Sequence, residues 1–194
     1  MIGLLALAAA AAASDTPDRI AIQAVHNYGA CVADRSPDGA RELLAMDFHS
    51  RDYDKKLRRS MKGHAECFPF NGRLASSRLL FAGAMAEALL KSEVRSATLP
   101  QQLAYDPARE MIAARSPSEA MALCTVLQAP EATARIFATE PATPEEITAM
   151  KPLGSVLPEC LKKDMKVELN KPALRSLLAL AAYRIATTPT KAAQ

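Results

Sequence analysis

Four cysteines constrain this chain more than any other feature of its sequence. They form two pairs with the same separation of 36 residues, from position 31 to 67 and from 124 to 160. The chain has no C-x-x-C motif, which argues against a zinc ribbon or a thioredoxin-like redox site. An even number of cysteines is typical of disulfides in an oxidising compartment. We therefore expect structural disulfides, the alternative being four reduced, buried thiols in a cytosolic protein. The residues concerned are Cys31, Cys67, Cys124 and Cys160.

The equal spacing also predicts an internal repeat. A shift of 93 residues superimposes the two cysteine pairs and several other positions. These positions are Pro37 with Pro130, Ala45 with Ala138, Ser50 with Thr143, and Glu66 with Glu159. Such self-similarity is the signature of a duplicated structural unit. A repeat favours one disulfide in each unit, Cys31–Cys67 and Cys124–Cys160, although four cysteines allow three pairings and the sequence leaves them open.

Composition and periodicity both favour helices. Tryptophan is absent and aromatic residues make up 5% of the chain, so small and aliphatic side chains must fill the core. Proline follows a capping residue at several predicted helix starts, as in Ser36-Pro37 and Thr143-Pro144. The predicted fold class is mainly α: about eight helices in two similar four-helix units, each with one disulfide. The predicted ranges are 1–13 signal peptide, 14–95 first unit, 96–115 linker, 116–187 second unit and 188–194 tail.

Helix caps can be assigned individually. Ser50, Ser76 or Ser77, and Asn170 each precede an apolar periodic segment, as N-cap residues do. Ser116 and Thr143 are each followed at the third position by a glutamate, which predicts capping boxes. The helix over 79–90 is almost entirely apolar, which predicts that it is the central one, and the last long helix is its counterpart in the second unit. Small residues at 83–88 and 179–182 would let these two helices pack closely against each other.

The N-terminus resembles a targeting segment. An uncharged apolar run covers residues 2–13 and ends in three alanines before Ser14, a pattern that signal peptidase accepts. Such a run is too short to cross a membrane, which takes about 20 residues, and no other stretch predicts a span. No basic residue precedes the run, so either the N-terminal amine serves alone or the true start lies upstream. The alternative is an alanine-rich first helix. We expect a periplasmic or secreted protein.

No catalytic, cofactor or metal signature is present. The three histidines, His26, His49 and His64, do not have the spacing of ligands on one helical turn. Phosphate-binding glycine loops and nucleophile motifs are also missing. We therefore predict no catalytic residues, no cofactor and no metal. If the chain were an enzyme without a familiar signature, His26 and Tyr28 would be the first residues to test.

One charged surface stands out. Arg51, Lys55, Arg58 and Lys62 recur at helical spacing, and we call these four residues the basic stripe. Such a stripe is a candidate anion-binding face for an envelope protein or an anionic surface, and its alternative is an ordinary solvated face. The net charge of +3 is spread evenly along the chain, so we expect no nucleic-acid partner.

The sequence therefore predicts an exported helical protein and leaves its partner open. The leading hypothesis is a non-catalytic binding or interaction module of the cell envelope. The alternatives are an envelope enzyme without a familiar signature and a carrier of a small apolar ligand between the two helical units.

Overall fold

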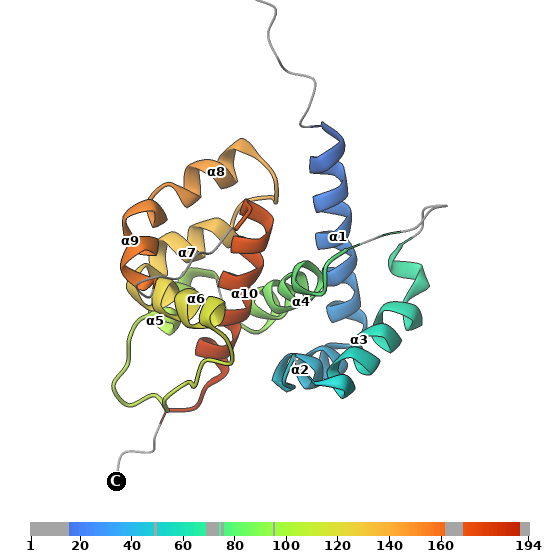
Figure 1. The fold of residues 1–194 in the computed structure, drawn as a ribbon, viewed down its shortest axis with the longest axis horizontal. Coiled ribbons are helices and arrows are strands. Elements are labelled where there is room, and N and C mark those ends of the chain that lie inside the picture. The colour runs from blue at the N-terminus through green and yellow to red at the C-terminus, as the bar shows by residue number, and fades with distance from the viewer. Residues whose placement is uncertain are drawn as a thin grey trace, which may run out of the picture.

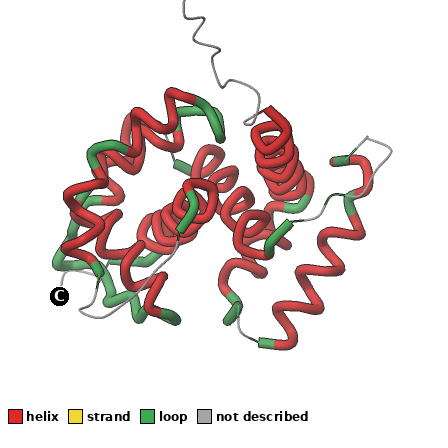
Figure 2. Tube along the Cα trace, turned by 45° about the horizontal axis from the view of Figure 1, so that its top comes forward, coloured by secondary structure: helices red, strands yellow, loops and turns green. Residues whose placement is uncertain are grey.

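A computed structural model describes residues 16–48, 50–68, 74, 76–94, 96–161 and 169–190, with side chains placed from residue 19 onward. Within these ranges the chain forms ten α-helices, two short 3₁₀ helices and no β-strand (Figures 1 and 2). The prediction of a mainly helical protein is confirmed.

Each half of the chain contributes one group of helices, as Figure 1 shows on the two sides of α4 and α10. The first half contains α1 (Thr16–Arg35), α2 (Pro37–Ala45), α3 (Arg51–Gly63), η1 (Ala65–Cys67) and α4 (Arg78–Glu93). The second half contains α6 (Pro117–Gln128), α7 (Pro130–Phe137), α8 (Pro144–Met150), α9 (Leu153–Cys160) and α10 (Lys171–Thr187). Between them lie η2 (Ser96–Thr98) and α5 (Leu99–Leu103).

One disulfide joins distant parts of each half. The Cys31–Cys67 bond links α1 to η1, and the Cys124–Cys160 bond links α6 to α9. The Cα atoms are 5.6 Å apart in both bonds, which is an ordinary disulfide separation. The pairing that the repeat favours is thus the one that the structure contains.

Side-chain caps begin most of the longer helices. The Ser50 and Ser77 hydroxyls accept hydrogen bonds from the Tyr53 and Leu80 backbone N–H groups, at 3.1 and 3.3 Å. The Asn170 side chain accepts one from the Ala173 N–H at 2.9 Å and begins α10. These bonds satisfy donors that a helix leaves free in its first turn, which is why the capping residues mark the helix starts.

The centre of the fold is α4, which packs against α1 on one side and α10 on the other. Glycine makes both crossings close. A Cβ atom at Gly29 of α1 would lie 2.6 Å from the Ala84 Cβ of α4. A Cβ atom at Gly83 of α4 would lie 2.5 Å from the Ser176 Cα of α10. The nearly apolar helix is therefore central, and its small residues join the two halves into one core.

The segment between the halves is more ordered than the linker that we expected. It contains α5, whose Leu99 and Leu103 side chains are buried in the common core. Further along, Arg109 and Thr190 form an antiparallel bridge, and the Glu110 N–H donates to the Pro189 carbonyl at 3.2 Å. Residues 188–190 of the predicted tail thus pair with the linker.

No helix in the described part of the chain is both long enough and apolar enough to cross a membrane. The predicted signal peptide and His49 lie outside the described residues. Two formed disulfides fit a protein of an oxidising compartment.

Candidate functional site

A cleft of about 400 Å³ lies between the two halves of the molecule. Ligand pockets for small molecules fall at about 300–1,000 Å³, so this cleft is large enough to hold one. We call it the inter-unit cleft. It is lined by Leu44, Met46, Phe48, Tyr53, Arg78, Leu79 and Ala82 from the first half, and by Arg115, Ser116, Ser118, Glu119, Leu177, Leu180, Tyr183 and Arg184 from the second.

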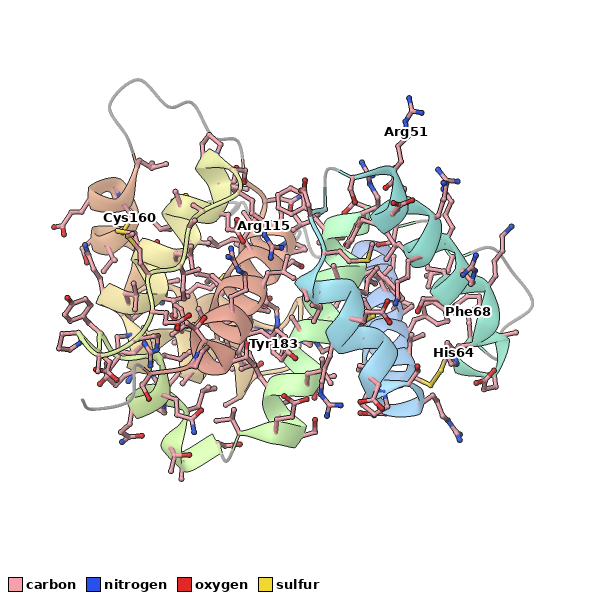
Figure 3. All side chains as sticks on the ribbon, turned by 90° about the horizontal axis from the view of Figure 1, so that it is seen from below. Arg51, His64, Phe68, Arg115, Cys160 and Tyr183 are labelled. Atoms are coloured by element: carbon pink, nitrogen blue, oxygen red, sulfur yellow. A yellow bond between two sulfur atoms is a disulfide. The ribbon has the colours of Figure 1, made fainter. Side chains whose placement is uncertain are left out.

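The body of the inter-unit cleft is apolar. Leu44 at the end of α2 and Leu79 on α4 face it from the first half, and Leu177 and Leu180 on α10 face it from the second. Figure 3 shows Tyr183 and Arg115 near the middle of the molecule, at the border between the halves. An apolar cavity with a few polar groups at its edge is the usual form of a small-molecule site.

Three arginines carry the positive charge of the inter-unit cleft, and their partners differ. Arg78 forms an ion pair with Asp54, and Arg184 forms one with Glu119. Arg115 instead donates to the Met46 and Ala45 carbonyls, at 2.9 and 3.3 Å. The described residues provide no carboxylate partner for the Arg115 guanidinium.

The phenol of Tyr53 responds to this charge. Tyr53 is almost completely buried, and burial raises the pKa of its hydroxyl. The positive charges of Arg78 and Arg115 act in the opposite direction on the same pKa. Asp54 raises this pKa further, and the pKa of Tyr53 lies above its ordinary value, so the phenol is neutral near neutral pH.

A second group of charges lies inside the protein and not in the inter-unit cleft. Arg175 of α10 binds both oxygens of Glu87 on α4, at 2.7 and 2.8 Å, and one oxygen of Glu146 on α8, at 2.8 Å. We call Glu87, Arg175 and Glu146 the buried ion cluster. Their exposed fractions are 1%, 3% and 2%, so the cluster is out of reach of a ligand and holds α4, α8 and α10 together.

The ionisation of the buried ion cluster follows from its contacts. Burial would raise the pKa of Glu87, but the contact with the His26 ring and the hydrogen bonds and positive charge of Arg175 outweigh it, and this pKa lies well below its ordinary value. Burial would lower the pKa of Arg175, but Glu87 and Glu146 raise it more. Glu87 and Arg175 are therefore charged near neutral pH.

The residues that we singled out for an enzyme make contacts inside the first half. His26 Nε2 lies 3.2 Å from a Glu87 oxygen, without the alignment of a hydrogen bond. The Tyr28 hydroxyl donates to the Met61 carbonyl, and its ring packs against Phe81 at 5.5 Å. His64 lies 3.3 Å from the Glu66 carboxylate at the surface. These contacts do not bring the three residues together.

The basic stripe lies on the outer face of α3. All four of its side chains are exposed, and Arg51 points away from the body of the protein (Figure 3). Lys55 pairs with Asp52 at 3.4 Å on the same helix. Anion binding at this face stays a prediction.

Comparison of the chain with protein-family models, curated proteins and solved structures found no match.

Proposed function

We propose that this protein is a non-catalytic binding protein of the cell envelope, and that it holds a small, largely apolar molecule in the inter-unit cleft. The observation that carries this proposal is the cleft itself. Its walls come from both halves, and its mainly apolar lining includes three arginines and one glutamate. Ligand sites commonly lie at such borders between packed units.

The proposed cellular location of the protein rests on two features. The apolar run at residues 2–13, followed by small residues, has the pattern of a cleavable signal peptide. Both disulfides are structural bonds of a kind that persists in oxidising compartments. Together they support a periplasmic or secreted protein.

A duplication supports the position of the cleft. Both halves have the same order of helices, with a disulfide across the same separation of 36 residues. Two related units packed through α4 and α10 create a border that neither unit has alone. The proposed ligand site lies along that border.

Native mass spectrometry of the protein recovered from its own host, without reductant, tests the proposed location and the presence of a bound ligand together. The expected mass corresponds to a chain that starts near Ser14, reduced by four hydrogens for two disulfides, plus the mass of a bound small molecule. A full-length, reduced chain without ligand would contradict both parts of the proposal.

Binding in the inter-unit cleft can be tested with the neutral apolar dye N-phenyl-1-naphthylamine, whose fluorescence rises when it leaves water. Leu180→Trp should fill the cleft and abolish the rise, because Leu180 lines it and is only partly buried. Ile147→Trp on the exposed face of α8 is the matched control and should leave the signal intact. No rise with the unsubstituted protein, or an equal rise with both variants, would refute the site.

A further inference from the structure

We infer that the natural ligand is a carboxylate-headed amphiphile, with its apolar chain in the inter-unit cleft and its carboxylate on Arg115. This inference rests on the proposed function and specifies the ligand that the same site would take. It follows from the charges around the cleft and from the geometry of one guanidinium.

The charges of the inter-unit cleft leave one positive charge without a balancing acid among the described residues. Arg78 is matched by Asp54 and Arg184 is matched by Glu119, both in direct ion pairs. Arg115 has only the carbonyls of Met46 and Ala45. A ligand with a single negative charge would complete the balance, and two negative charges would exceed it.

The chemistry of the head group follows from the guanidinium. A guanidinium has five N–H donors in a rigid, planar fork that matches a carboxylate in two parallel hydrogen bonds. Two of the Arg115 nitrogens already donate to carbonyls, and this fixes the side chain in place at the edge of the inter-unit cleft. A fixed cation beside an apolar wall loses little entropy when a carboxylate binds.

The rest of the ligand must be apolar. Beyond the arginines, the walls are mainly leucine, methionine and aromatic side chains, which offer few partners to a sugar or a peptide backbone. Burying an alkyl chain there should strengthen binding about four-fold for each methylene group. An aliphatic chain with one terminal carboxylate satisfies both parts of the inter-unit cleft.

The test compares decanoate with decanol, which have the same chain and differ in charge, as competitors for the bound neutral dye. A hydrogen bond to a charged group contributes about 1.5–3 kcal/mol, so decanoate should displace the dye at a concentration about 10- to 150-fold lower than decanol. Arg115→Met should remove this preference, so that decanoate and decanol displace the dye at similar concentrations. Arg51→Met in the basic stripe is the matched control and should keep the preference.

Each outcome separates this inference from the proposed function. Equal displacement by decanoate and decanol in the unsubstituted protein would overturn the carboxylate and leave an apolar binding protein. Absence of dye binding would overturn the proposed function and the inference together. Because Arg115 also holds the end of α2, the preference of the unsubstituted protein decides the question even if Arg115→Met does not fold.

Discussion

The two halves of the molecule cap their helices in the same way but use the third residue of the helix differently. In the first half the hydroxyl of Ser50 caps α3, and the third residue is the buried Tyr53. In the second half Thr143 caps α8, and the third residue is the buried Glu146. The shift of 93 residues aligns these two positions. A capping hydroxyl therefore begins both helices. The third residue of the helix packs through its aromatic ring in the first half and makes charged contacts in the second.

The difference extends to a second helix of the second half. Glu119, third in α6, accepts from the Arg115 N–H at 2.5 Å and pairs with Arg184 of α10. Glu146 accepts from the Ala142 N–H at 2.8 Å and pairs with Arg175 of α10. The arginines of α10 thus hold the starts of α6 and α8. The aligned position in the first half, Tyr53, is instead a buried aromatic ring.

The largest effect should come from Arg175→Met. The change removes the cation that Glu146 pairs with and leaves Glu87 with Lys91, at 2.8 Å, as its remaining ion pair besides the contact with His26. Loss of one partner from a buried ion pair costs about 3–5 kcal/mol of stability. Chemical denaturation measures this loss as a lower midpoint. Arg58→Met on the exposed face of α3 should change stability by less than about 0.5 kcal/mol.

A second variant separates a missing cation from a missing contact. Replacing all three members of the buried ion cluster by apolar residues of similar size removes the uncompensated charges. It should recover much of the stability that Arg175→Met loses. An Arg175→Met protein as stable as the original would show that the buried ion cluster does not hold α4, α8 and α10 together.

The next largest effect should come from removing either disulfide, and it tests whether the two bonds stabilise their halves equally. Each disulfide closes a loop across a separation of 36 residues, for which the chain-entropy model gives about 4 kcal/mol. Replacing either pair by alanine should therefore lower the free energy of unfolding by similar amounts, measured by denaturation without reductant. A difference of more than about 1 kcal/mol would mean that the native halves respond differently to losing the bond, since the entropy term is the same in both.

Local signals made much of this fold predictable from the sequence. The caps at Ser50, Ser116 and Thr143 depend on residues within one helical turn, and the structure contains all three. The central position of α4 followed from its lack of a polar face. The disulfide pairing required the additional hypothesis of a repeat, because cysteine spacing alone permits three answers.

The buried ion cluster and the inter-unit cleft were not predictable in the same way. Glu87 and Arg175 lie 88 residues apart, and only the crossing of α4 and α10 brings them together. Glu146 had a sufficient local explanation, because an acid in a first helical turn is favoured by the helix dipole. One signal was available: each of the two apolar helices contains a single charged residue in its most buried stretch. The inter-unit cleft is a gap between packed units, which no periodicity encodes.

A smaller effect should appear at acid pH as a difference between the buried Glu87 and an exposed carboxylate. The depressed pKa of Glu87 means that its contribution to stability is complete above the unfolded pKa of about 4.3 and decreases as the pH falls toward the folded value. Denaturation between pH 5 and 2 should show the original protein losing up to about 1.4 kcal/mol more per pH unit than Glu87→Gln.

Glu66 in the first half is the matched control for this acid effect. Its own backbone N–H and then the His64 side chain lower the pKa of its carboxyl, but Glu66 is exposed to solvent. Glu66→Gln should therefore follow the original protein at every pH. Parallel curves for Glu87→Gln and the original protein would contradict the charged state assigned to the buried ion cluster.

The smallest effect concerns the backbone that supports Glu146. Ala142 has a φ of 58°, in the left-handed region that favours glycine, and this conformation places its N–H on the Glu146 carboxylate. The left-handed conformation costs alanine about 1–2 kcal/mol, and glycine loses about 0.5–1 kcal/mol more entropy on folding. Ala142→Gly should therefore raise the free energy of unfolding by about 0.5 kcal/mol. The same substitution at Ala30, inside α1 of the first half, should lower it by about 1 kcal/mol. In thermal denaturation, a higher melting temperature for Ala142→Gly and a lower one for Ala30→Gly would show that the second half accepts backbone strain to satisfy a buried carboxylate. Equal decreases in the melting temperature of both variants would show that it does not.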